Sequence, residues 1–444
     1  MPRWLLTVLL TGAAAAGVAT LWRSPLVTSR PSAPREPVAR PPAATNDCFD
    51  LHAGLDRMAV PPRGQVERTL VVTVTGRADC GATRLPLDLA LVVDVSGSMR
   101  DDHKLTHARS AALSLLDRLD ETDHVSLVSF SDNGRIWGTE AATSELPREW
   151  LRGLTPEGGT NLGEGLEEGL GMLTPQAGRL RRVVLLTDGR ANLGLTTADQ
   201  LVPLLTRRDD VTVSTMGLGA DYDELLLGAL AESGHGRFHH AETVTDLADA
   251  YASELEGARH VAARGVELRI TPPAGGTLTP LGGTPVRATD TGVIATIGDL
   301  AAGETRTIVV HVTTGPDASG GTTIDAVGQR PGGPQRLQAM ATVTPIVSAD
   351  PRAWEVQDPR LVVAVARAEA AEDLALAREE YLDGRREEAQ RRLDSRVQAL
   401  LQVQNLHLEA DFAPVAAKLH EISTAPTAAL QGKRAYATSQ ELAQ

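Results

Sequence analysis

The chain has 444 residues, which is too long for one ordinary hydrophobic core, so we expect two or three domains. Its 43 basic and 57 acidic side chains give a formal net charge of −14, which argues against a nucleic-acid partner because phosphate binding needs a basic surface. Aromatic residues make up only 3% of the chain, which also argues against stacking platforms for single-stranded nucleic acid.

The N-terminus has the pattern of an export signal or a membrane anchor. Residues Trp4–Trp22 carry no charge and follow Arg3, and a helix of this length rises about 28 Å, enough to cross the hydrocarbon layer. Small residues such as Ala13–Ala16 also offer cleavage sites, so a cleaved signal peptide and a retained anchor over residues 1–23 both stay open. Either one predicts an exported protein of the cell envelope, on its periplasmic or extracellular face, membrane-anchored or secreted.

Residues 24–47 form a linker with six prolines and few apolar side chains. Such a composition is typical of an extended tether. The two cysteines of the chain, Cys48 and Cys80, come after the linker, and an oxidising compartment would let them pair as a disulfide. Two buried free thiols are the alternative, and a zinc site would need more ligands than these two.

Apolar strands and amphipathic helices alternate over residues 86–257. The strands are continuous apolar runs such as "LALVVDV" and "RRVVLLTDG", which are typical of a sheet covered on both faces. The first helix, expected over 103–119, repeats Leu and Ala at helical spacing. Strands that alternate with helices predict parallel βαβ units. We therefore expect residues 86–257 to form one doubly wound, Rossmann-like α/β domain.

Short alternating strands precede and follow this domain in the sequence. Those of residues 258–348, such as "ETRTIVVHVTT", are separated by Gly, Pro and Asp clusters, which predicts a small β-sandwich. Residues 48–85 have the same texture, with "RTLVVTVTG" as the clearest strand. We expect these early strands to complete the sandwich, with the α/β domain inserted between its two parts. A strand at 66–76 that pairs with none from 260–347 would contradict this interpretation.

The C-terminal part of the chain is rich in Ala, Glu and Arg. Apolar residues recur at helical spacing on either side of Gly384, so residues 351–424 are expected to form a helical hairpin or bundle. No element is predicted for the tail, residues 425–444. The fold class that follows is α/β, with a β-sandwich domain and a C-terminal helical region added to the doubly wound domain.

Five oxygen-bearing side chains lie in loops of the α/β domain. Asp94, Ser96 and Ser98 lie at the end of one apolar strand, Asp188 follows another, and Thr160 lies in the Gly-rich loop "TPEGGTNLGEG" before a helix. In an open parallel sheet, ligands bind at the carboxyl ends of the strands, near the point where strand order reverses. Two carboxylates and three hydroxyls suit a hard divalent cation, Mg²⁺ or alternatively Mn²⁺ or Ca²⁺, rather than zinc. The competing interpretation is a simple turn, since Asp, Ser and Gly favour turns.

The D-x-S-x-S sequence at Asp94, Ser96 and Ser98, with Thr160 and Asp188 downstream, resembles the metal-ion-dependent adhesion site of von Willebrand factor type A domains. The resemblance covers about residues 86–257, with all five family positions filled. It implies direct metal contact by the two serines and the threonine, and contact largely through water by the two aspartates. It also implies that a partner protein supplies a carboxylate as the last ligand. A metal-free copy of the fold is the alternative.

The order of export signal, α/β domain, sandwich and helical region also resembles bacterial envelope proteins described as calcium-activated chloride channel homologues. The function expected from both resemblances is non-enzymatic, namely a Mg²⁺-dependent, adhesion-type module that binds an acidic residue of a partner protein. A metal-dependent envelope hydrolase and an accessory subunit of a membrane assembly are the alternatives. The sequence has neither a P-loop nor a serine-hydrolase elbow. A membrane is a partner only through the N-terminal anchor, if that is not cleaved.

Two further groups of polar residues have simpler interpretations. Asp101, Asp102 and His103 are expected to begin the first helix, where acids favour the N-terminal dipole. His239 and His240 are neighbours on a strand. Since successive side chains of a strand point to opposite faces, these two histidines are not expected to share one metal ion.

Overall fold

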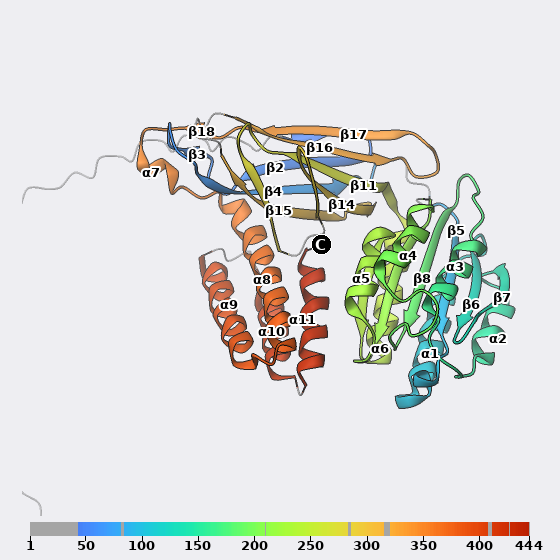
Figure 1. The fold of residues 1–444 in the computed structure, drawn as a ribbon. Helices are drawn as coiled ribbons and strands as arrows, with labels where there is room; N and C mark the ends of the chain where they lie inside the picture. The colour runs from blue at the N-terminus through green and yellow to red at the C-terminus, as the bar shows by residue number, and fades with distance from the viewer. Residues whose placement is uncertain are drawn as a thin grey trace, which may run out of the picture. The chain divides into compact units, whose positions relative to one another are not determined.

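The computed structural model describes residues 43–80, 84–208, 210–282, 286–314, 320–406, 411–425 and 427–443. The predicted export segment, residues 1–23, and most of the linker lie outside these residues. Within the part of the chain that is described, no helix is both long and apolar enough to cross a bilayer. The fold class is the expected one, an α/β domain with additional strand-rich sheets and C-terminal helices (Figure 1).

A six-stranded sheet in the order β10-β9-β8-β5-β6-β7 forms the centre of the α/β domain. Five of its strands are parallel, and β7 runs antiparallel to β6 at one edge. The strands are Leu87–Asp94 (β5), His124–Phe130 (β6), Gly134–Ala141 (β7), Leu180–Thr187 (β8), Thr212–Leu218 (β9) and His235–Ala241 (β10). Strand order runs outward from β5 in both directions, so the topological switch point lies between β5 and β8.

Helices cover both faces of this sheet. On one face Leu91 and Tyr251 are buried in a core shared with α1, α2 and α6. On the other face Leu166 and Tyr222 are buried in a core shared with α3, α4 and α5. The helices are Lys104–Leu116 (α1), Leu146–Gly153 (α2), Leu162–Met172 (α3), Ala198–Thr206 (α4), Glu224–Ser233 (α5) and Val244–Arg259 (α6). Because the central strands are covered on both sides, they have no polar face, and their sequences are continuous apolar runs.

Two five-stranded antiparallel sheets form the β-sandwich and share one apolar core. The first sheet has the order β1-β2-β4-β15-β12, with strands Ala43–Thr45, Phe49–Leu55, Glu67–Gly76, Thr305–Thr313 and Thr277–Leu281. The second has the order β13-β14-β11-β16-β17, with strands Val286–Thr289, Gly292–Ala301, Val261–Thr271, Thr322–Gln329 and Arg336–Val343. Two short strands, Ala59–Val60 (β3) and Ile346–Val347 (β18), pair separately.

Strand β15 pairs with β4 along its whole length, from Thr305 opposite Thr75 to Thr313 opposite Glu67. The strand at 66–76 therefore does pair with a strand from the later segment, as the inserted-domain interpretation requires. Because β4 precedes the α/β domain in the sequence and β11 follows it, the chain leaves the sandwich, builds the α/β domain and returns.

Cys48 and Cys80 are joined by a disulfide inside the sandwich. Both side chains are buried, at 0% and 7% exposure, and their Cα atoms lie 4.5 Å apart. The bridge links residues 32 positions apart in the sequence. In the chain-entropy model a loop of this length stabilises the fold by roughly 3–4 kcal/mol, because the cross-link restricts the unfolded chain.

Four helices of the C-terminal region pack around an apolar core that includes Leu374, Tyr381, Leu400 and Leu419. They are Pro359–Leu382 (α8), Arg386–Leu406 (α9), Ala413–Thr424 (α10) and Ala428–Ala443 (α11), and a short helix, Pro351–Trp354 (α7), precedes them. Helix α11 occupies the segment for which the sequence predicted no element. It packs mainly against α8 (Figure 1).

Helix α11 also connects the helical region to the α/β domain. Lys433 Nζ lies 2.7 Å from Glu224 Oε2 at the start of α5, and Arg378 Nη2 of α8 lies 2.7 Å from Glu224 Oε1. The ring of Tyr436 packs on that of Phe238 in β10, with centroids 5.5 Å apart. One carboxylate of the α/β domain thus binds cations from two C-terminal helices.

We predict that Glu224→Gln loosens this contact. Lys433 and Arg378 would then lie largely buried without their counter-charge, which costs about 3 kcal/mol for a buried pair. Hydrogen–deuterium exchange of α11 amides should become faster in the variant, while the exposed control Glu167→Gln in α3 should match the wild type. Unchanged exchange in Glu224→Gln would show that the ion pair does not hold α11.

The pH dependence of the same contact follows from the pKa of Glu224. Burial acts to raise this pKa, but the hydrogen bonds from Lys433 and Arg378 outweigh burial and lower it to about 2. The stabilisation is therefore complete above the ordinary value of 4.5 and is lost as the pH falls toward 2. The protection of α11 amides in the wild type, taken relative to the intrinsic exchange rate at each pH, should therefore decrease as the pH falls across that range.

Candidate metal centre

The switch point of the sheet brings the two predicted aspartates to the same place. Asp94 is the last residue of β5, and Asp188 directly follows β8, the strand that pairs with β5 on one side. Both carboxylates are completely buried, at 0% exposure. Two acids in such positions need partners that compensate for the lost water.

Asp94 is held by the loop that follows it and by β8. Its Oδ1 accepts a hydrogen bond from the backbone N–H of Ser96 (2.7 Å), and its Oδ2 accepts one from the hydroxyl of Thr187. Burial raises the pKa of Asp94 to about 6, although these hydrogen bonds act in the opposite direction. The carboxylate is thus poorly compensated by the protein alone.

Ser96 and Ser98 connect the two aspartates. The hydroxyl oxygens of the serines lie 3.0 Å apart, and the Ser98 hydroxyl donates to Asp188 Oδ1 at 2.7 Å. The other oxygen of Asp188, Oδ2, lies 2.8 Å from the Nζ of Lys104 at the start of α1. Four of the five predicted residues therefore form one connected hydrogen-bonded chain that ends at a lysine.

Thr160 reaches the same place from a third loop. The backbone of that loop is bonded to the Asp94–Ser98 segment, since the N–H of Gly97 donates to Gly158 O at 3.0 Å. A Cβ atom built on Gly189 would lie 3.5 Å from Thr160 Oγ1 and 3.6 Å from Ser98 Oγ. Both hydroxyls thus face the same glycine, directly after Asp188. All five predicted side chains are brought together at the carboxyl edge of the sheet.

The Gly-rich loop that carries Thr160 requires glycine for geometric reasons. Gly158 has φ of +65°, which favours glycine, and a Cβ there would lie 2.8 Å from the Asp132 carboxylate. That carboxylate accepts a hydrogen bond from the N–H of Gly159 (2.6 Å). Asn192 holds Thr160 itself, because its Oδ1 accepts from the Thr160 N–H at 2.9 Å. The position of Thr160 is therefore fixed by neighbours on two other loops.

The donor set fits a hard divalent cation. It consists only of carboxylate and hydroxyl oxygens, the ligands that Mg²⁺ and Ca²⁺ prefer. In the described part of the chain, no three His, Cys, Asp or Glu side chains lie close enough together to hold a metal ion. Hydroxyl groups would therefore have to complete the coordination shell at this site, as they do in the predicted set.

Three residues of this region were not predicted from the sequence. Thr187 and Asn192 hold Asp94 and Thr160, and Lys104 compensates Asp188. The sequence signal for Lys104 is its place six residues after Ser98, at the start of an amphipathic helix. A cation there points back to the strand ends, since side chains of a helix tilt toward its N-terminus.

The expected helix start at Asp101–His103 is wrong. These residues belong to a 3₁₀ segment, Gly97–His103, and α1 begins only at Lys104. Asp102 and His103 have φ of 49° and 57°, in the left-handed region. The chain needs this reversal because it must turn from the Asp94–Ser98 loop into α1 while Lys104 reaches Asp188.

His239 and His240 bind different partners, as their alternation on β10 predicts. His239 Nε2 lies 2.7 Å from Glu254 Oε1, whereas His240 Nδ1 lies 2.6 Å from the hydroxyl of Tyr222. The two rings therefore stabilise opposite faces of the sheet and do not share a metal ion.

Comparison with known proteins agrees with this geometry. The sequence profile of the von Willebrand factor type A domain family matches residues 88–253. The chain contains a von Willebrand factor type A domain. Such domains commonly mediate protein–protein interaction.

The solved von Willebrand factor type A protein from Catenulispora acidiphila has a TM-score of 0.70 at 16% identity, and the match covers 91% of this chain and 98% of that protein's chain. The ArnB paralog VWA2 from Sulfolobus acidocaldarius has a TM-score of 0.62 at 16% identity, with 89% and 99% covered. At this identity the two structures show a shared fold, which extends beyond the von Willebrand factor type A domain.

Curated relatives match over less than half of this chain. An uncharacterised protein of Synechocystis sp. is 34% identical over 185 residues, which are 40% of this chain and 43% of that protein. YfbK of Escherichia coli, also uncharacterised, is 28% identical over 212 residues, 46% of this chain and 37% of YfbK. Inter-alpha-trypsin inhibitor heavy chain H2 of Homo sapiens is 28% identical over 169 residues, 34% of this chain and 17% of that protein. The matched region thus spans less than half of each relative.

We predict that Lys104→Met destabilises the protein in EDTA by about 3 kcal/mol, because it leaves Asp188 buried beside Asp94 without a counter-charge. Chemical denaturation followed by circular dichroism measures the free energy of unfolding. Arg207→Met, at an exposed position after α4, is the control and should change it little. If the two variants are equally stable, the Lys104–Asp188 pair does not compensate the site.

Proposed function

We propose that the chain is a non-enzymatic, Mg²⁺-dependent interaction module of the cell envelope. Asp94, Ser96, Ser98, Thr160 and Asp188 would hold the cation, as in an intact metal-ion-dependent adhesion site, and a partner protein would supply a carboxylate. The observation that carries the proposal is the convergence of these five oxygen-bearing side chains from three loops at the switch point.

The charges around the site support a carboxylate as the outside ligand. Asp94 and Asp188 carry two negative charges when ionised, and Lys104 returns one positive charge. A divalent cation among them leaves the site with one excess positive charge. A carboxylate from a partner neutralises it and gains a charge-assisted interaction in a poorly solvated place.

A binding role is also favoured by what the nearby glutamates do. Two glutamates lie in the loop and helix start that carry Thr160. Glu164, in the first turn of α3, accepts a hydrogen bond from Asn161 Nδ2 at 2.8 Å. Its carboxylate therefore holds Asn161, the N-cap residue of α3, whereas a hydrolase would need a base beside the metal-bound water. The other, Glu157, is exposed.

The location in the envelope rests on the sequence of residues 1–23 and on the disulfide between Cys48 and Cys80. Disulfides persist in oxidising compartments, which agrees with export. The resemblance to calcium-activated chloride channel homologues concerns this same order of parts, and we include it in the proposal without extending it to channel activity.

We predict that Mg²⁺ raises the midpoint of thermal unfolding of the wild type but not of Asp94→Asn. At a Mg²⁺ concentration of 100 times Kd the stabilisation is about 2.7 kcal/mol. Thr160→Ala should shift the Mg²⁺ titration to higher concentration. Asp199→Asn, exposed in α4, should behave as the wild type. Equal Mg²⁺ shifts in wild type and Asp94→Asn would contradict the proposed site.

Mg²⁺ affinity should fall as the pH drops below about 6. The pKa of Asp94 is raised to about 6 by burial, so below this value a proton competes with the cation. Without Mg²⁺ the sign for stability is opposite: the unfolded carboxyl ionises near 3.8, so ionisation destabilises the fold as the pH rises toward 6. Isothermal titration calorimetry across pH 5–8 measures the first effect, and constant affinity would contradict it.

The role of a partner carboxylate can be tested by affinity capture from an envelope extract. A partner should be retained by the wild type in Mg²⁺ and released by EDTA, and Asp94→Asn should retain none. Conversion of the carboxylates in the extract to amides should abolish capture. Capture that survives amidation would show that the partner does not bind through an acid.

A further inference from the structure

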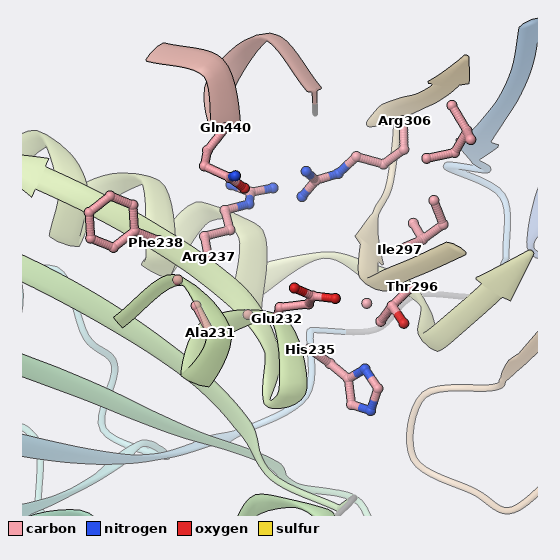
Figure 2. A pocket seen from close by; sticks show the side chains of 13 residues that line it. Ala231, Glu232, His235, Arg237, Phe238, Thr296, Ile297, Arg306 and Gln440 are labelled. Carbon is pink, nitrogen blue, oxygen red and sulfur yellow. The ribbon is translucent and has the colours of Figure 1, made fainter. Parts of the chain in front are cut away.

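A small cavity lies where the α/β domain, the sandwich and α11 meet (Figure 2). Its volume is about 60 Å³, and it is lined from five elements, α5, β10, β14, β15 and α11. One water molecule needs about 10–15 Å³ of such space. The cavity therefore has room for roughly five non-hydrogen atoms, the size of a very small organic molecule. It is distinct from the candidate metal centre, since none of its lining residues belongs to that site.

Two guanidinium groups form one wall of this cavity. Figure 2 shows the side chains of Arg237 and Arg306 directed toward one another, with the amide of Gln440 beside Arg237. Arg306 is 8% exposed, and its Nε has no hydrogen-bond partner among the described residues. Burial, and then the charge of Arg237, lower the pKa of Arg306 to about 10. An oxyanion there would accept charge-assisted hydrogen bonds from both groups.

The neighbouring acids leave part of this positive charge uncompensated. Glu304 Oε1 lies 2.8 Å from Arg306 Nη2 and also forms an ion pair with Arg237. The other oxygen, Glu304 Oε2, accepts a hydrogen bond from the N–H of Ala301 (2.8 Å). Two cations thus share one carboxylate oxygen. The next acid, Glu254, pairs with Arg182 at 2.7 Å. The wall therefore carries one positive charge without a carboxylate of its own.

The opposite side of the cavity carries a negative charge. Glu232, at the end of α5, directs its carboxylate into the cavity in Figure 2, and its side chain is exposed at the mouth. Within the described residues its carboxylate has no ion pair or hydrogen bond. Apolar side chains, among them Phe238 and Ile308, complete the lining. A ligand of matching chemistry carries a carboxylate at one end and an ammonium group at the other.

We propose that this cavity binds a small zwitterion, a free α-amino acid with a small side chain. Arg306 and Arg237 bind its carboxylate, Glu232 binds its ammonium group at the mouth, and the apolar wall limits the side chain to about the size of hydrogen or methyl. Because α11 contributes Gln440 to the same cavity, an occupied cavity joins the helical region, the sandwich and the α/β domain through one ligand. The proposal is independent of the metal site.

The test uses the full chain and isothermal titration calorimetry with glycine and L-alanine as probes. Acetate and ethylamine each carry one of the two charges, and inorganic phosphate tests for a plain oxyanion site. The wild type should bind glycine at least about tenfold more tightly than acetate or ethylamine, because two charge-assisted contacts are made together. Glu232→Gln should weaken glycine about tenfold and leave acetate unchanged, and Arg306→Gln should weaken both.

Two controls keep the result interpretable. Arg287→Gln and Glu167→Gln lie at exposed positions away from the cavity and should bind as the wild type does. Arg306→Gln also removes an ion pair to Glu304, so its fold is checked by circular dichroism, whereas Glu232→Gln removes no hydrogen bond or ion pair among the described residues. The proposal is overturned if glycine does not bind, if acetate or phosphate binds as tightly as glycine, or if Glu232→Gln binds glycine normally.

Discussion

Two carboxylates that lose their water side by side are the constraint around which the α/β domain is built. Asp94 and Asp188 end adjacent parallel strands at the switch point, and both are completely buried. The protein compensates them only in part, through hydroxyl groups, one backbone N–H and Lys104. Burial raises the pKa of Asp94 more than its hydrogen bonds lower it, so the compensation of its charge is incomplete. A divalent cation would supply the missing positive charge, and the excess it brings is what a partner's carboxylate would neutralise.

Among the described residues, the sandwich packs against the α/β domain away from the carboxyl edge of the sheet, where the metal-site loops lie. The sandwich contacts the amino ends of β8 and β9, where Thr212 donates to Asp299 and Arg182 lies near the same carboxylate. The C-terminal helices contact α5 and β10 through Glu224 and Phe238. The metal-site loops therefore remain separate from the contact with the sandwich, and one chain combines a binding edge with two attached parts.

The sequence predicts those parts of the fold where pattern and burial agree. The central strands are apolar throughout because they are covered on both sides, and the five oxygen-bearing residues stand out because each follows a strand or precedes a helix. Strand β7 escapes prediction because it is a half-exposed edge strand with a mixed sequence. Helix α11 is not predicted from the sequence because the side chains it buries include Gln431, Lys433 and Ser439, so its buried face shows no apolar periodicity. The arginines of the cavity act through tertiary contacts that spacing along the chain does not encode.

Anomalous diffraction from crystals grown with Mn²⁺ would locate a bound cation in the α/β domain. We expect one strong peak at the carboxyl edge of the sheet, within coordination distance of the hydroxyls of Ser96, Ser98 and Thr160, and no peak there in crystals of Asp94→Asn. A peak elsewhere, or none at this edge in the wild type, would show that the five side chains converge without holding a cation.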